Sequence, residues 1–111
     1  MAFKMTQNPT FSTPVKVNVP NDQGGFDKNT FTAKFKRPTH EEATELRELN
    51  LSPEELTRKM MVDWDLTNAD TNERVPFSRE NLEVALRILP TPLACAVAFW
   101  ESVHGARTKN L

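Results

Sequence analysis

The side chains best suited to chemistry lie in the polar stretch around and after Trp64. This stretch offers carboxylate and amide oxygens at Asp63, Asp65, Asn68, Asp70 and Asn72. Oxygen donors at such spacing are typical of calcium-binding loops, which also require a glycine at the sixth position and a glutamate at the twelfth. Counted from Asn68, those positions hold Glu73 and Arg79. We therefore expect a solvated loop whose Asn and Asp side chains hydrogen-bond their own backbone, and we predict no metal site.

Other reactive side chains are too scattered to form a catalytic or metal-binding group. His40, His104 and the single cysteine, Cys95, lie far apart in the sequence, whereas structural zinc ligands come in close pairs. Cys95 lies among small apolar residues, which predicts a buried and unactivated thiol. The three glycines of the chain are too few for a glycine-rich phosphate loop. We expect no enzymatic activity and no cofactor.

The composition indicates one soluble domain with a modest core. The chain has 111 residues, of which 38% are hydrophobic and 26% charged, and its net charge is −1. A nearly neutral chain gives no electrostatic reason to expect nucleic-acid binding. No uninterrupted run of about 18 apolar residues is present, so we expect no membrane span. The N-terminus lacks the apolar segment of a secretory signal, and a lone cysteine agrees with a reducing cytoplasm.

The first part of the chain alternates with a period of two, which indicates β-strands. Val15, Val17 and Val19 alternate with polar residues, and Phe31, Ala33 and Phe35 do the same after a turn-rich segment at 20–25. These two runs predict an antiparallel β-hairpin over residues 13–37. We expect residues 1–12 to form a flexible N-terminus.

From residue 39 the period becomes helical, and four short helices are predicted up to residue 105. Thr39 with Glu42 and Ser52 with Glu55 form capping boxes at the starts of the first two. The second helix is expected to continue to Trp64, because Leu56, Met60 and Trp64 recur every four residues.

Ser78 is the expected cap of the third helix and Thr91 that of the fourth, which Gly105 ends in a left-handed conformation. The predicted fold class is therefore α+β: an N-terminal antiparallel β-hairpin followed by about four short α-helices. Residues 13–105 form the single domain, with the helical part at 39–105, and residues 106–111 form a flexible tail.

The fourth predicted helix is apolar nearly all round. In "LACAVAFW", a helical period puts one stripe at Leu93, Ala96, Val97 and Trp100 and places Phe99 well to its side. A helix of this kind is either central in its domain or partly given to another chain. Both interpretations stay open at this point.

The order of these segments resembles a tail assembly chaperone of long-tailed bacteriophages. The segments are "FKRPTHEE", "MVDWDL", "VPFSRENLEVAL" and "LPTPLACAVAFWESVHGARTKN", and the likeness covers about residues 13 to 110. Its most specific parts are Trp64, the segment from Pro76 to Leu82, and a final helix that ends in a short basic stretch. The chain departs from the family in lacking a glycine in the loop after the tryptophan, which puts the geometry of that loop in doubt.

The resemblance implies a non-catalytic protein of the infected host's cytoplasm that is absent from the mature virion. Such proteins bind and solubilise the tape measure protein and help to recruit subunits of the major tail tube protein. Flexible methionines beside aromatic rings suit a groove for a long amphipathic helix. The candidate partner-binding residues are Met60, Met61, Trp64, Phe77, Phe99 and Trp100. Trp64 and Phe77 are also natural core anchors, and homo-oligomerisation stays open.

Two other functions fit the sequence less well. A virion structural adaptor, either a head–tail connector or a tail-completion protein, would have the same size and would remain in the particle. A small regulator that binds nucleic acid would have to use "KFKRP" at residues 34–38, which is the only basic cluster and is too short to favour such binding.

Overall fold

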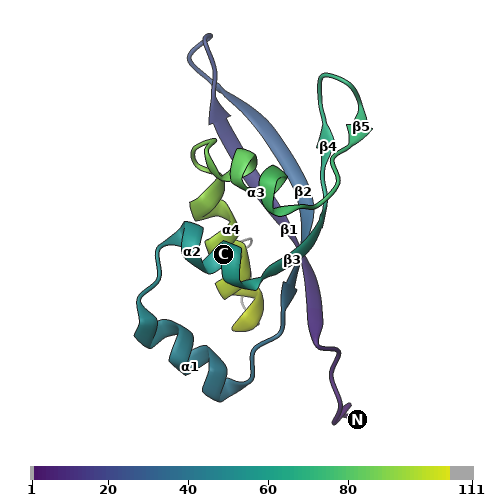
Figure 1. Ribbon diagram of the computed structural model, residues 1–111, viewed down its shortest axis with the longest axis vertical. Coiled ribbons are helices and arrows are strands. Elements are labelled where there is room, and N and C mark those ends of the chain that lie inside the picture. Colours follow the sequence, from purple (N-terminus) through teal and green to yellow (C-terminus); the bar gives the residue numbers. More distant parts are fainter. Residues whose placement is uncertain (1, 106–111) are drawn as a thin grey trace.

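The structure is a computed structural model that describes residues 2–105. Three strands form one sheet, two short strands form a second small hairpin, and four helices complete the fold (Figure 1). In chain order the elements are β1 (Thr10–Pro20), β2 (Phe26–Lys36), α1 (His40–Leu49), α2 (Pro53–Met60), β3 (Met61–Asp65), β4 (Thr67–Asn68), β5 (Glu73–Arg74), α3 (Arg79–Leu86) and α4 (Thr91–Val103). The predicted α+β class, with its hairpin and four helices, is confirmed.

The β1–β2 hairpin follows the alternation of the sequence. The strands pair antiparallel along their whole length, from Thr10 opposite Lys36 to Pro20 opposite Phe26. The turn uses Gly24 at a φ of 81°, a left-handed conformation that glycine adopts at little cost. The strand begins at Thr10, earlier than the predicted start at residue 13. Residues 10–12 therefore do not belong to the expected flexible N-terminus, because Phe11 packs on the core.

The alternating residues face the core as predicted. Val15, Val17, Phe31, Ala33 and Phe35 are all buried, while the residues between them are exposed or half-buried. One face of the sheet therefore meets the helices, and the other meets solvent.

Both predicted capping boxes are present at the starts of α1 and α2. The Thr39 hydroxyl accepts a hydrogen bond from the Glu42 backbone N–H (3.1 Å), and the Glu42 carboxylate accepts one from the Thr39 N–H (2.9 Å). Ser52 and Glu55 repeat the arrangement. Each box gives partners to two backbone N–H groups that a helix start leaves without any.

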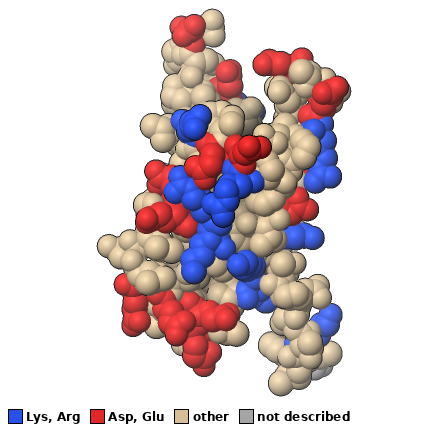
Figure 2. Space-filling view, in the orientation of Figure 1, with Lys and Arg blue, Asp and Glu red and all other residues tan. Residues whose placement is uncertain are grey.

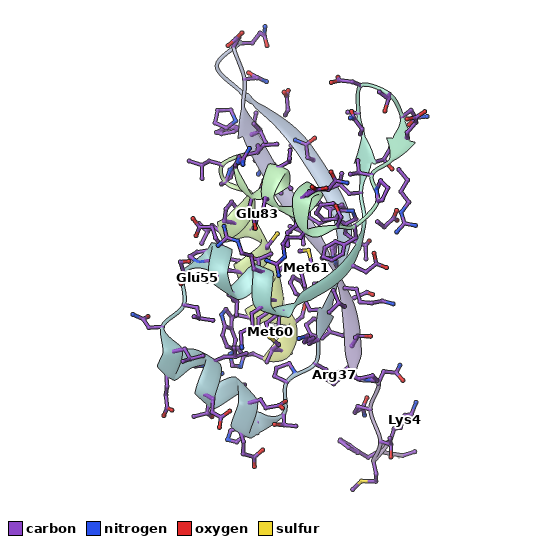
Figure 3. All side chains as sticks on the ribbon, viewed as in Figure 1. Lys4, Arg37, Glu55, Met60, Met61 and Glu83 are labelled. Atoms are coloured by element: carbon purple, nitrogen blue, oxygen red, sulfur yellow. The ribbon has the colours of Figure 1, made fainter. Side chains whose placement is uncertain are left out.

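The prediction that the second helix continues to Trp64 is wrong. α2 ends at Met60, and Met61–Asp65 forms strand β3, which pairs antiparallel with β2 (Figure 3). Met61 lies opposite Phe35 and Asp63 opposite Lys34, so Val62 is an extra residue in a β-bulge. The bulge shifts the register by one residue, and so Met61 and Trp64 both face the core although they are three residues apart. Because of the bulge, the buried residues of this strand recur at a spacing that is typical of a helix.

The last two helices agree with the sequence except at one cap. The Ser78 hydroxyl accepts a hydrogen bond from the Asn81 backbone N–H (3.1 Å) and caps α3. Thr91 is not the cap of α4 but its first residue, and the capping position holds Pro90 without a side-chain hydrogen bond. Gly105 follows α4 with a φ of 73°, as predicted. The predicted tail at 106–111 lies outside the described residues.

Helix α4 lies at the centre of the domain. It packs on the inner face of the sheet against β1, and α2 and α3 pack on α4 (Figure 1). Phe99 of α4 has no exposed surface, and its ring lies 5.2 Å from that of Phe35 and 6.0 Å from that of Phe11. The core therefore forms where the hairpin and α4 meet.

We predict that Phe99→Ala lowers the free energy of unfolding by about 3–5 kcal/mol, because it empties a fully buried site. Phe3→Ala is the matched control, since the Phe3 side chain is 81% exposed and its removal should change stability little. Denaturant-induced unfolding measures both. Equal effects of the two substitutions would contradict the assignment of the core.

A second prediction concerns pH and the ion pair between α2 and α3. Arg58 donates hydrogen bonds from Nε and Nη2 to the two Glu83 oxygens (2.6 and 2.9 Å), and this contact holds the pKa of Glu83 below its ordinary value. The pKa of Glu55 is lowered mainly by the hydrogen bond from the Ser52 backbone N–H. Figure 3 shows both carboxylates.

A carboxylate whose pKa is lower in the folded state stabilises the fold above its ordinary pKa, and this stabilisation is lost as the pH falls through the lowered value. Thermal unfolding of wild-type protein should therefore show a decline of the melting temperature below about pH 4.5. Glu83→Gln should flatten part of that decline. Glu80→Gln, on the same helix and outside the ion pair, should leave it unchanged.

Candidate functional site

The structure places most of the predicted partner-binding residues inside the domain. The side chains of Met60, Met61, Trp64 and Phe99 are between 0% and 6% exposed. Phe77 and Trp100 are half-buried against the same core. Four of the six are therefore core residues in this structure and offer almost no surface to a partner. The suggested groove of methionines and aromatic rings is thus not exposed at Met60, Met61 and Phe99, and partner binding by these residues stays a prediction.

Trp64 is the anchor of the loop that follows it. Its indole Nε1–H donates a hydrogen bond to the Val75 carbonyl oxygen (2.7 Å), and its ring meets Phe77 edge-on at 5.1 Å. The Arg74 guanidinium donates to the Trp64 carbonyl (2.8 Å). These contacts join the two ends of the polar loop, so Trp64 and Phe77 act as the core anchors that the sequence favoured.

The polar loop folds on itself as predicted. The Asn68 side-chain oxygen accepts a hydrogen bond from the Asp70 N–H (2.9 Å), and the Thr71 hydroxyl accepts one from the Glu73 N–H (3.3 Å). Asn72 has a φ of 60° between the short strands β4 and β5. Within residues 2–105, no group of three or more His, Cys, Asp or Glu side chains is arranged to hold a metal ion.

Trp100 is half-buried, lies beside two polar side chains and lines a small pocket of about 300 Å³. The Arg47 guanidinium lies 5.1 Å from the centre of the Trp100 ring, and the His104 ring stacks on Trp100 with the ring centres 5.8 Å apart. Arg47 Nη2 also lies 2.8 Å from His104 Nε2. This cluster ties α1 to the end of α4.

The exposed apolar side chains gather in another place. Nine large hydrophobic side chains are exposed in the described part of the chain, and five of them belong to one short stretch of α3, α4 and their connection. We call these five the α3–α4 apolar surface: Val84, Ile88, Leu89, Leu93 and Val97. Their exposed fractions range from 42% to 73%.

The sequence contained a signal for this surface. Leu93 and Val97 belonged to the predicted stripe of the fourth helix and are exposed, whereas Ala96 of that stripe is buried with Cys95, Ala98 and Phe99. Because α4 is apolar on several faces, burying one face leaves another exposed. The all-round apolar pattern thus indicated an outward face, although not which residues form it.

A groove of about 970 Å³ runs beside this surface, between the free edge of β1 and helix α4. β1 is an edge strand, since it pairs only with β2 in the sheet order β1–β2–β3. Leu93 and Val97 of α4 line one side of the groove, and Pro14 and Lys16 of β1 line the other. The α3–α4 apolar surface therefore continues into a concave region.

Acidic side chains are concentrated on one helix of the surface. Figure 2 shows acidic side chains gathered over α1 and basic side chains across the middle of the same face. The helix α1 has glutamates at positions 41, 42, 45 and 48. The outer face of the sheet carries the lysines Lys16, Lys28, Lys34 and Lys36, with Asp63 of β3 opposite Lys34.

No single helix among the described residues is long and apolar enough to cross a membrane; α3 and α4 meet the length and composition test only when counted together, across a bend of 106°.

Comparison of the chain with protein-family models, with curated proteins and with solved structures gave no match.

Cys95 is buried, and burial alone raises the pKa of its thiol to about 12. The buried, unactivated thiol that the sequence predicted is confirmed. The neutral thiol is a poor nucleophile, because the thiolate is the reactive form.

We predict that Cys95 does not react with an aromatic disulfide reagent at about pH 8, where an ordinary thiol is partly ionised. The same protein should react at once in concentrated guanidinium, which exposes the thiol and serves as the control. The release of the coloured thiolate measures both reactions. Fast reaction of the folded protein would contradict the burial of Cys95.

Proposed function

We propose that this protein is a non-catalytic tail assembly chaperone of a long-tailed bacteriophage. In this proposal it binds and solubilises the tape measure protein in the host cytoplasm, helps to recruit subunits of the major tail tube protein, and is absent from the mature virion. The sequence resemblance suggests the family. The single structural observation that supports a protein-binding role is the α3–α4 apolar surface.

The concentration of the exposed apolar residues is what makes this surface informative. Single exposed hydrophobic residues are common on soluble domains, whereas groups of them mark binding surfaces. Here Leu89 and Leu93 are 73% and 57% exposed on one short stretch of chain. Exposed apolar side chains contribute nothing to the stability of the fold, because only apolar surface that is removed from water does so. A bound apolar partner would remove this surface from water.

A chaperone of an extended partner needs only modest affinity at each site. Several copies can bind along one long chain, and where neighbouring copies also contact one another their weak contacts add through avidity. A small domain with one apolar surface is suited to such repeated binding.

Co-expression with the tape measure protein of the same genome tests the proposal. We predict that the large protein becomes soluble only with this one and that the two co-purify with several copies per partner. The double variant Ile88→Ser, Leu89→Ser should lose this effect, because it removes exposed apolar contacts from the surface. Phe26→Ser is the matched control, since Phe26 is 62% exposed at the far turn of the hairpin.

Mass spectrometry of purified virions separates the proposal from the virion adaptor. A chaperone should be missing from the particles. Detection of this protein in virions at stoichiometric amounts, together with an insoluble tape measure protein, would replace the chaperone function with the adaptor function.

A further inference from the structure

The groove between β1 and α4 has one apolar side and one basic side. Leu93 and Val97 form the apolar side, where Glu101 of α4 also lines the groove, while Lys16 and Arg37 lie on the side of the sheet. Neither cation makes an ion pair within the described residues, where the two ion pairs are Arg58–Glu83 and Arg74–Asp63. β1 contains no acidic residue. The sheet side of the groove therefore carries two cations, against the single carboxylate of Glu101 on the helix side.

Arg37 is held in position without losing its charge. Its Nε donates a hydrogen bond to the Asn8 carbonyl oxygen (2.8 Å), and its guanidinium lies 5.6 Å from the centre of the Phe11 ring. Figure 3 shows it at the end of β2, beside the N-terminal segment. A guanidinium fixed by neutral partners is available to a carboxylate of another molecule.

The edge of β1 is poorly suited to bind a strand. At the two ends of the hairpin, the Arg37 N–H donates to the Pro9 carbonyl and the Asn21 N–H donates to the Gly25 carbonyl. Because hydrogen-bonded and non-hydrogen-bonded pairs alternate in an antiparallel ladder, the odd-numbered β1 residues bond to β2. The backbone groups of the even-numbered β1 residues therefore point to the free edge. Pro14 is one of them, and it has no N–H to donate.

Pro14 thus interrupts the edge near its middle, and Lys16 adds a charge two residues later. Both features are typical of edges that are protected against strand pairing. A partner in the groove must therefore bind mainly through side chains. An amphipathic helix binds in this way, with residues at helical spacing entering an apolar groove.

We infer that the groove binds an amphipathic helix that has an acidic flank. The apolar stripe of the helix packs on Leu93 and Val97, and its acidic flank faces Lys16 and Arg37. Ala94 and Ala98, which also line the groove, have small side chains and allow a close approach. The inference rests on the proposed function, because it specifies which kind of segment of the partner binds in the groove.

A second copy of the chain is a less suitable occupant. Its most acidic helix is α1, but Ala43 and Leu46 of that helix are buried in its own core, and Leu49 at its end is the one apolar residue of α1 that is exposed. A folded copy therefore cannot offer the apolar stripe of α1 together with its carboxylates. An external helix has no such restriction.

Two designed peptides about five turns long test the inference. Both have a leucine stripe at helical spacing; one carries glutamates on its flanks, and its twin carries lysines at the same positions. Fluorescence anisotropy with the full-length protein at low salt measures binding. We expect the acidic peptide to bind about tenfold more tightly than its twin, and added salt should reduce the difference.

Variants of the protein locate the binding. Leu93→Ser with Val97→Ser should abolish binding of the acidic peptide, and Lys16→Glu should remove its preference over the basic twin. Lys59→Glu, the same charge reversal on the exposed face of α2, is the matched control and should bind as wild type. Circular dichroism confirms that each variant is folded; the two surface serines replace exposed side chains and leave the core intact.

Equal binding of the two peptides, or unchanged binding to the folded Leu93→Ser, Val97→Ser variant, would overturn the inference. The inference would also be overturned if wild-type protein bound neither peptide and formed a dimer that the Leu93→Ser, Val97→Ser variant converted to a monomer. A second copy of the chain would then occupy the groove. Failure of the co-expression experiment with a retained preference for the acidic peptide would refute the proposed function alone. Successful co-expression without any preference between the peptides would refute the inference alone.

Discussion

The packing of Phe99 on the inner face of the hairpin is the contact on which the fold depends. A two-stranded hairpin is marginally stable in water, and the β1–β2 pair buries its valines and phenylalanines only because α4 covers them. The Phe99 ring contacts Phe11, Phe35 and Trp100. It thereby joins both long strands to the helix that α2 and α3 pack against. The remaining elements are arranged around this contact.

Much of the fold could be predicted from local patterns. The alternating valines and phenylalanines gave the hairpin and its buried face, and the hydroxyl-to-glutamate spacing located the starts of α1 and α2. β3 could not be predicted in this way, because the bulge at Val62 gives a strand the spacing of a helix. The start of β1 depended on the contact of Phe11 with the distant Phe99, which no local pattern contains.

The binding surface was less predictable than the core, for a physical reason. Methionines and aromatic rings are the residues that partners bind and also the residues that cores bury. In this chain Met60, Met61, Trp64 and Phe99 were used by the core. The exposed aliphatic residues of α3 and α4 became the surface instead, because α4 has more apolar faces than the sheet and α2 can cover. Tertiary packing therefore determines that the methionines and aromatic rings are buried and that the aliphatic residues of α3 and α4 are exposed.

The direct passage from α2 to β3 limits how this protein can vary in length. Helix and strand meet at Met60 and Met61 with no residue between them, and the bulge follows at once. Successive residues of a strand face opposite sides of the sheet, so one residue gained or lost here would turn Trp64 away from the core. The turn at 21–25 and the loop at 69–72 have no such constraint. Relatives of different length should therefore differ at those two loops and keep the spacing from Leu56 to Trp64.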